Sequence, residues 1–269
     1  MALRSETKLI HPRIHPLVEL DSVFFRRDLE IARDVQRASF PQQTPAIPGL
    51  TCASFYQPAH IVGGDYYDFL PLADGTWGIA IGDVSGKGIG AALVMASLQA
   101  SLRAQALHAP TGIETVMRNV NQLVCESSPE HFFASLFYGE YQPATRILNY
   151  VNAGHNPPIV LRRNDDGCEI LLLKPGGVPV GALEGSQYTC KTFQLEIGDV
   201  LVAYTDGITE SENSVGDPFG QEGLEKTLCS CADRDPQESL QHILNELAAY
   251  SAGRSQRDDI TLVVMQARA

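Results

Sequence analysis

The chain has 269 residues, of which 44% are hydrophobic and 19% charged, a composition typical of a globular protein with a substantial core in one large or two small domains. Its 32 acidic and 20 basic residues give a formal net charge of −12. Nucleic-acid binding usually requires the opposite balance, so we expect no nucleic-acid partner. The sequence has no apolar signal segment and no uncharged run of 18 apolar residues, so we expect neither secretion nor a membrane span.

Six cysteines are scattered along the chain and none forms a C-x-x-C pair. This spacing favours buried reduced thiols over a disulfide framework or a zinc site. We therefore expect a cytoplasmic protein.

Residues 1–16 are polar and contain two His-Pro pairs, which predicts a loose leader. His11 and His15 have the spacing of a helical metal pair, but the prolines beside them oppose a continuous helix. We expect no metal site there.

From Leu17 to Phe40 apolar residues recur at helical spacing. Pro41 ends this pattern, and the prolines within residues 42–49 predict a linker. The helix could pack on its own domain or form an arm that pairs with a second subunit, and the pattern favours neither. We therefore divide the chain into a leader, helical arm and linker over residues 1–45 and a main domain over residues 46–269.

Short runs rich in β-branched and aromatic residues predict β-strands in the main domain, and longer runs predict helices. Short turns between successive strands favour antiparallel pairing, and strands interleaved with long helices indicate an α+β layered sandwich. The predicted strands are Thr51–Gln57, Trp77–Gly82, Phe132–Tyr141, Ile147–Asn152, Pro158–Leu161, Ile170–Leu173, Tyr188–Leu195, Val200–Tyr204 and Ile260–Met265. The predicted helices are Ile89–Leu107, Ile113–Glu126, Glu222–Leu228 and Pro236–Ala252.

Four short segments place aspartates beside a glycine or a strand end, where a stiff scaffold holds the side chain. They are GGDYYD at 63–68, GDVSGKG at 82–88, YTDG at 204–207 and RDDIT at 257–261. Each segment alone is more often an ordinary turn or helix cap. If the four converge, however, their carboxylates repel one another, and divalent cations such as Mg²⁺ or Mn²⁺ are the natural remedy.

Other phosphate and hydrolase motifs are missing. The glycines at 82–90 have neither the G-x-x-x-x-G-K-[ST] spacing of an ATP-binding loop nor the G-x-G-x-x-G of a dinucleotide site. The chain also lacks the G-x-S-x-G turn of serine hydrolases. Metal-assisted hydrolysis is the chemistry that remains.

In their order, these segments resemble the PPM-type (protein phosphatase 2C-like) metal-dependent phosphatases, and within them the bacterial SpoIIE/RsbU-like branch. The resemblance runs from about Leu29 to the C-terminus. It implies a four-layer α/β/β/α sandwich with two largely antiparallel sheets flanked by helices, and it makes residues 46–269 a phosphatase domain. Six segments carry it: ARDVQ and FP at 32–36 and 40–41, VGGDYYDF at 62–69, GDVSGKG at 82–88, NAGHNPP at 152–158, TDGITE at 205–210 and DDIT at 258–261.

The resemblance implies a centre of two divalent cations, Mn²⁺ or Mg²⁺. Asp83 would be the carboxylate that both cations share, and the backbone carbonyl of Val84 would be a further ligand. Asp206 and Asp258 would complete the centre, while Asp65 would bind a cation directly or through water. Asp83, Asp206 and Asp258 are thereby the expected catalytic residues, acting through metal-bound water.

Asp68 and Asp259 are expected to orient waters or the ligands themselves without touching a cation. Water that bridges two cations loses a proton near neutral pH, because coordination can lower its pKa from ~15.7 to about 7. The resulting hydroxide would attack phosphorus in line with the leaving seryl oxygen.

The sequence departs from the eukaryotic members, which have Asp-Gly-His-Gly-Gly where this chain has DVSGK at 83–87. The histidine proposed there as general acid is missing, so metal-bound water or another group must protonate the leaving oxygen. Lys87 could contact phosphate, but the pattern favours a solvated surface lysine. His155 is expected to order the turn before Pro157 rather than to act in catalysis.

The implied function is dephosphorylation of serine or threonine on a signalling protein, in the stress response, with a phosphorylated STAS-domain anti-sigma-factor antagonist as the leading substrate. The alternative is a member with weak or no activity that binds a phosphoprotein and regulates it, and a hydrolase of small phosphate esters is a third hypothesis. None of the four cation-binding aspartates is missing, which favours an active enzyme. Because related phosphatases usually follow a sensor module, we expect the helix at 17–40 to form a homodimer or to bind an external activator.

Overall fold

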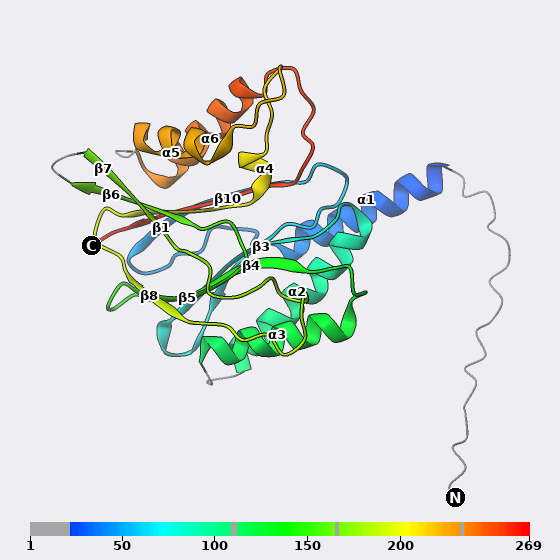
Figure 1. The fold of residues 1–269 in the computed structure, drawn as a ribbon, viewed down its shortest axis with the longest axis horizontal. Coiled ribbons are helices and arrows are strands. Elements are labelled where there is room, and N and C mark those ends of the chain that lie inside the picture. The colour runs from blue at the N-terminus through cyan, green and yellow to red at the C-terminus, as the bar shows by residue number, and fades with distance from the viewer. Residues whose placement is uncertain (1–21, 109–111, 165–166, 232–233) are drawn as a thin grey trace, which may run out of the picture.

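Two five-stranded antiparallel sheets face each other in the computed structural model, which describes residues 22–108, 112–164, 167–231 and 234–269 (Figure 1). Sheet A has the strand order β1 (Leu50–Gln57), β10 (Ile260–Ala267), β9 (Val200–Tyr204), β6 (Ile159–Asn164) and β7 (Gly167–Leu172). Sheet B has the order β2 (Tyr66–Pro71), β3 (Trp77–Val84), β4 (Ala134–Gln142), β5 (Ile147–Ala153) and β8 (Lys191–Gln194).

Helices cover the outer face of each sheet (Figure 1). α2 (Ile89–His108) and α3 (Ile113–Ser127) pack on sheet B, whereas α6 (Pro236–Tyr250) packs on sheet A and α5 (Gly220–Ser230) packs on α6. The short helix α4 (Asp206–Thr209) follows β9 directly, and a 3₁₀ turn spans Ala73–Gly75. The predicted α+β sandwich of four layers is confirmed.

The central strands of sheet A are buried on both faces, which explains their continuous apolar sequences. In β9, Leu201 and Ala203 point into the core between the sheets, while Val200 and Val202 join the core beneath α5 and α6. All eight residues of β10 are buried. The last strand of the chain is therefore an interior strand of its sheet.

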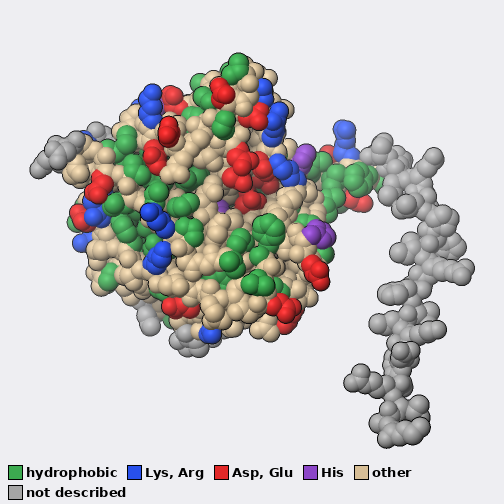
Figure 2. Space-filling view, in the orientation of Figure 1, with side chains coloured by type: hydrophobic (Ala, Val, Ile, Leu, Met, Phe, Trp, Pro, Cys, Tyr) green, Lys and Arg blue, Asp and Glu red, His purple; other side chains and the backbone are tan. Residues whose placement is uncertain are grey.

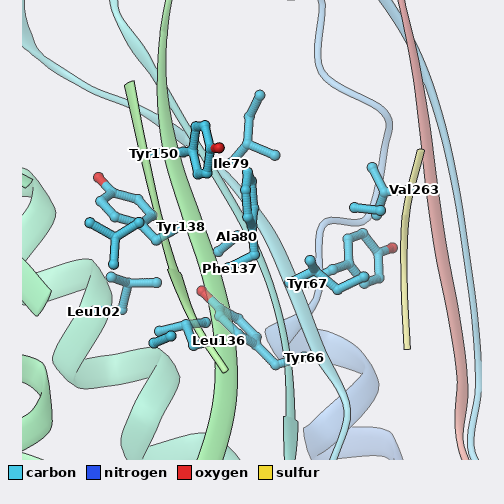
Figure 3. Close-up of a cluster of buried hydrophobic side chains, with 14 of the residues drawn as sticks. Tyr66, Tyr67, Ile79, Ala80, Leu102, Leu136, Phe137, Tyr138, Tyr150 and Val263 are labelled. Atoms are coloured by element: carbon cyan, nitrogen blue, oxygen red, sulfur yellow. The ribbon is translucent and has the colours of Figure 1, made fainter. Parts of the chain in front are cut away.

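The core between the two sheets continues to the outer face of sheet B, so it lies against both faces of that sheet (Figure 3). Tyr66 and Leu136 extend toward Leu102 of α2, whereas Tyr67 extends toward Val263 of β10. Neighbouring side chains of β2 thus pack on opposite faces of sheet B, as the alternation of side chains along a strand requires. β2 is a strand that the sequence analysis did not predict.

Helix α1 (Ser22–Ser39) agrees with the predicted helix over residues 17–40, of which residues 17–21 lie outside the described part of the chain. Its C-terminal end packs against the main domain. The ring of Phe40, just beyond α1, stacks on Tyr56 at 4.4 Å between centroids, and the side chain is only 6% exposed. The leader at residues 1–16, with His11 and His15, also lies outside the described residues.

Two other expectations concern the described residues. All six cysteines are free, but the expected burial holds only for Cys231: Cys229 is exposed and the other four are half-buried. None of the described helices combines the length and the apolarity that crossing a membrane requires.

Candidate metal centre

Four of the predicted ligands lie at strand ends of the two sheets. Asp83 is next to last in β3, and Asp65 directly precedes β2, which pairs with β3. Asp206 directly follows Thr205 at the end of β9, and Asp258 lies two residues before β10, which pairs with β9. Acidic side chains gather near the middle of one face of the molecule (Figure 2).

Asp65 is held between the sheets by two threonines of sheet A. Its carboxylate oxygen Oδ2 accepts hydrogen bonds from the hydroxyls of Thr205, at 2.7 Å, and Thr261, at 2.5 Å. The side chain is only 1% exposed. The sequence analysis included both threonines in its motifs but gave them no role; their position immediately before Asp206 and just after Asp259 is the signal that could have found them.

Asp259 fixes the loop that carries Asp65. Its Oδ1 accepts a hydrogen bond from the backbone N–H of Ala59, and its Oδ2 accepts one from Gly64, each at 2.7 Å. Asp259 is buried beside the cluster, and its charge adds to burial and to the other carboxylates in raising the pKa values of Asp65 and Asp83. These contacts are compatible with the predicted role of Asp259 in orienting the ligands.

Mutual repulsion marks these aspartates as one electrostatic cluster. Burial and then the neighbouring charges of Asp206 and Asp258 raise the pKa of Asp83 to about 8. Burial and then Asp83 raise the pKa of Asp65 well above its ordinary value, and burial followed by Glu210 raises that of Asp206 to about 6. The cluster thus holds more negative charge than its surroundings neutralise, which is the condition that a divalent cation relieves.

The backbone carbonyl of Val84 lies beside the loop that carries Asp65. A side chain on Gly64 would lie 2.9 Å from this oxygen, so the carbonyl approaches the loop before Asp65 closely. The backbone N–H of Val84 also donates to the carbonyl of Gly64 at 3.3 Å. Glycine at position 64 is therefore required by the close contact between the two strand ends.

Lys87 is an exposed residue whose side chain is paired with an aspartate of the cluster. Its ammonium group donates to Oδ2 of Asp258 at 2.6 Å and to the backbone carbonyl of Arg257 at 2.7 Å. Partial burial opposes its charge, but the hydrogen bond to Asp258 and the nearby charges of Asp206 and Asp259 raise its pKa overall. Lys87 is thus a surface residue, as expected, but it forms an ion pair that the sequence analysis did not predict.

A cleft of about 400 Å³ adjoins the cluster. Lys87 and Asp258 lie on its wall with Glu210, and apolar side chains of α6 such as Leu244 line another part. Arg254 contributes as well, but its guanidinium is paired with Glu212. The cleft offers a partly apolar surface beside the acidic cluster.

Asp68 is not brought to this cluster. Its side chain is fully buried and accepts hydrogen bonds from the guanidinium of Arg103 on α2 at 2.6 and 3.1 Å. The hydroxyl of Tyr66, at 2.9 Å, and the N–H of Phe69, at 2.9 Å, complete its partners. Asp68 therefore joins β2 to α2 on the far face of sheet B, away from the other predicted site residues.

His155 has the contacts of a structural residue. Its backbone N–H donates to Asn152 Oδ1 and its ring Nδ1 lies 2.8 Å from the hydroxyl of Ser135. Burial lowers its pKa to about 4, so the ring stays neutral at physiological pH. These contacts agree with the expected ordering of the turn before Pro157.

The donor set fits hard cations, since every candidate ligand offers oxygen. Among the described residues, no three His, Cys, Asp or Glu side chains are already gathered tightly enough to form a finished metal site. Hydrogen bonds to Lys87 and to the two threonines hold Asp258 and Asp65 in the arrangement described. Cation binding would therefore require these side chains to move.

Replacing Gly207 by Ala is expected to disturb the centre. A Cβ atom there would collide with the backbone carbonyl of Asp259, so two backbone segments must separate. We expect a loss of about 1–3 kcal/mol in the free energy of unfolding, as overpacking usually causes, with weaker Mn²⁺ binding. Thermal melting and Mn²⁺ titration measure both.

Gly223→Ala on α5 is the matched control, because the three atoms nearest to the added methyl group, at 3.2–3.3 Å, belong to the ring of Phe219, a side chain rather than backbone. This variant should melt near the wild-type temperature and bind Mn²⁺ normally. If Gly207→Ala did the same, the close approach of Gly207 to Asp259 would not matter for the site.

Comparison with known sequences places the chain in a family. The sequence model of stage II sporulation protein E (SpoIIE) matches residues 73–268. Protein IcfG of Synechocystis is 30% identical over 267 residues, which cover 89% of this chain and 41% of IcfG. The phosphoserine phosphatase RsbU of Bacillus subtilis is 30% identical over 246 residues, which cover 90% of this chain and 70% of RsbU. The chain thus spans less than half of IcfG.

Solved structures agree with this assignment. The RsbU and RsbW domains of Rv1364c from Mycobacterium tuberculosis superpose with a TM-score of 0.70 at 28% identity, covering 84% of this chain and 62% of that one. The catalytic domain of the serine/threonine protein phosphatase PstP, solved with two manganese ions, shares the fold with a TM-score of 0.60 at 15% identity, covering 82% and 99%. The chain therefore belongs to the SpoIIE family of PP2C-type phosphatases.

Proposed function

We propose that this chain is a metal-dependent protein phosphatase that hydrolyses phosphoserine or phosphothreonine on a signalling protein. The observation that carries the proposal is the convergence of Asp65, Asp83, Asp206 and Asp258 at adjoining strand ends of two sheets. Burial and then the charges of neighbouring carboxylates raise the pKa values of Asp65, Asp83 and Asp206. Family membership supports the same chemistry.

Two divalent cations, Mn²⁺ or Mg²⁺, would be held by Asp83, Asp206, Asp258 and the carbonyl of Val84, with Asp65 close by. When bound, such cations supply an activated water near neutral pH and neutralise charge on a phosphoryl group. The protein positions the carboxylates: Thr205 and Thr261 fix one oxygen of Asp65. The manganese ions of PstP support this choice of cation.

The leading substrate is a phosphorylated STAS-domain antagonist of an anti-sigma factor. Two similarities support this choice: RsbU is a phosphoserine phosphatase, and in Rv1364c an RsbU domain is accompanied by an RsbW domain. The cleft beside Asp258 has room for residues flanking a phosphoserine on a protein surface. We also propose a cytoplasmic location, where such a substrate would be met.

The test is hydrolysis of a phosphoserine peptide and of a phosphorylated STAS protein with Mn²⁺, Mg²⁺ or EDTA. We expect turnover that depends on the cation and is greater for phosphoserine than for phosphotyrosine. The alternative, a catalytically weak member that regulates by binding a phosphoprotein, predicts binding of the phosphorylated STAS protein without phosphate release. Hydrolysis of free nucleotides in preference to phosphoproteins would contradict both.

We further propose that residues 1–45 form an arm and linker through which two copies of the chain pair. Four apolar side chains of α1 support this proposal, because they are 47–66% exposed: Phe24, Phe25, Ile31 and Val35. Ile89 and Leu93 at the start of α2 are also exposed, at 46% and 68%. An apolar face of this kind is usually covered by a partner.

Changing Ile31 and Val35 together to Glu is expected to convert a dimer into a monomer. Charges on a buried apolar interface are costly to desolvate, whereas the fold should remain because both side chains are exposed. Light scattering of the wild type, the double variant and Val215→Glu, a control whose side chain is 77% exposed in a loop, measures the mass. A wild-type protein with the mass of one chain would refute the dimer.

A further inference from the structure

Lys87 makes the one described contact between a basic side chain and a predicted cation ligand. It lies in the loop between β3 and α2 and reaches the segment before β10, 171 residues further along the chain. There its ammonium group is shared between Oδ2 of Asp258 at 2.6 Å and the carbonyl of Arg257 at 2.7 Å. The side chain of Lys87 is 46% exposed and that of Asp258 is 27% exposed, so the pair lies at the mouth of the cluster.

This contact occupies a carboxylate oxygen that a cation would need. A lysine ammonium and a divalent ion repel each other, so each weakens the other's contact with Oδ2 of Asp258. A cation that binds through this oxygen therefore competes with Lys87. Until then Lys87 neutralises part of the charge of the cluster, as its contact with Asp258 and the nearby Asp206 and Asp259 show.

The other basic side chains described on the cleft are already matched. Arg254 and Arg257 both pair with Glu212, on the segment between α4 and α5. The partner of Lys87, in contrast, is itself a candidate ligand. Once Asp258 is engaged by a cation, Lys87 is left beside the centre with a flexible stem, a positive charge and no carboxylate of its own. A phosphoryl group, which carries negative charge into this same place, is the complementary partner.

We propose that Lys87 is a phosphoryl-binding residue that is held on Asp258 until a divalent cation takes that carboxylate. The inference rests on the proposed function for its substrate, a phosphorylated side chain, but its two consequences concern binding alone. Cation binding competes with the Lys87–Asp258 ion pair, and phosphate binding to the cation-loaded protein depends on Lys87.

A structural role for Lys87 makes the opposite prediction. If the lysine only tied the loop after β3 to the loop before β10, removing it would loosen the site and weaken cation binding. Under the present proposal, Lys87→Met frees Asp258 and strengthens cation binding. The direction of the change therefore separates the two roles.

The experiment measures two dissociation constants by isothermal titration calorimetry. For Lys87→Met we expect Mn²⁺ to bind about two- to fivefold more tightly than to the wild type, the range that an exposed ion pair contributes. Inorganic phosphate, used as the probe on Mn²⁺-saturated protein, should bind severalfold more weakly. Lys87→Arg should restore phosphate binding, and Lys226→Met, on the exposed face of α5, is the control that should change neither constant.

Unchanged or weaker Mn²⁺ binding by Lys87→Met would overturn the proposal, and so would unchanged phosphate binding. Phosphopeptide turnover by the wild type tests the proposed function separately. A wild-type protein that binds Mn²⁺ but releases no phosphate would refute the phosphatase activity, while the two titrations would still decide the role of Lys87.

Discussion

Asp83→Asn is expected to abolish phosphatase activity while leaving the protein folded. The charge of Asp83 interacts with that of Asp65 and also with those of Asp206 and Asp258. Removing a group that acts directly on charge in the transition state typically lowers kcat by ~10²–10³-fold, and loss of a shared ligand should reach at least that range. Phosphoserine peptide hydrolysis at saturating Mn²⁺ measures kcat, and calorimetry should show weaker Mn²⁺ binding.

The same variant should be more stable than the wild type when no cation is present. Because the pKa of Asp83 is raised to about 8 in the folded protein, its protonated form is favoured there. Its contribution to stability is full below the ordinary pKa of about 3.9 and is lost as the pH rises through 8. Asparagine removes this loss, so in EDTA the variant should melt at a higher temperature, most clearly near pH 8.

Asp34→Asn is the matched control, since the Asp34 side chain is 69% exposed on α1 and far in sequence from the cluster. It should leave both activity and melting temperature unchanged. An Asp83→Asn protein that hydrolyses the phosphopeptide at the wild-type rate would remove Asp83 from the mechanism. A lower melting temperature for Asp83→Asn in EDTA would show that other groups already neutralise the charge of Asp83 in the wild type.

Arg103→Met is expected to destabilise the protein strongly without affecting the cation site. The substitution keeps an apolar stem but leaves the fully buried carboxylate of Asp68 without its guanidinium partner. Breaking a buried pair costs about 3–5 kcal/mol. Arg103 itself is 41% exposed, so water can replace part of the interaction, and we expect about 2–4 kcal/mol. Urea unfolding followed by circular dichroism measures this loss.

Two further variants make the test specific. Arg33→Met removes an exposed ion pair with Asp34 on α1 and should change the free energy of unfolding by less than about 0.5 kcal/mol. Asp68→Asn combined with Arg103→Met should recover part of the stability, because no buried charge is left unpaired. Mn²⁺ affinity should stay at the wild-type value in all three variants, and a marked change in the double variant alone would return Asp68 to the metal centre.

The sequence predicted the layers of this fold well because most elements carry a clear period. The apolar run at Val200–Tyr204 is a strand with the predicted bounds, and the helices at 89–108 and 113–127 differ from prediction by one residue. β2 was missed because its sequence, YYDFLP, contains a buried aspartate whose partner is distant in the chain. No local pattern reveals that Arg103 neutralises this carboxylate.

The residues of the candidate site were predicted from the order of the motifs. The structure brings four of the predicted aspartates together but places Asp68 elsewhere. Asp65, Asp83, Asp206 and Asp258 share one electrostatic cluster, as strand ends of paired strands allow. Asp68 differs because the side chains of a strand alternate, which directs it to the opposite face of sheet B from Tyr67. The ion pair of Lys87 depends on the meeting of two distant loops, so the sequence alone could not distinguish it from a surface lysine.

The position of β10 also has a consequence for biosynthesis. This final strand lies between β1 and β9, with Leu50 opposite Ala267, and it is preceded directly by Asp258 and Asp259. A nascent chain that still holds these residues inside the ribosome can build sheet B and α2 but leaves β1 and β9 without their common neighbour. The aspartates of sheet A and those of sheet B can therefore come together only after β10 has left the ribosome and paired with both neighbours.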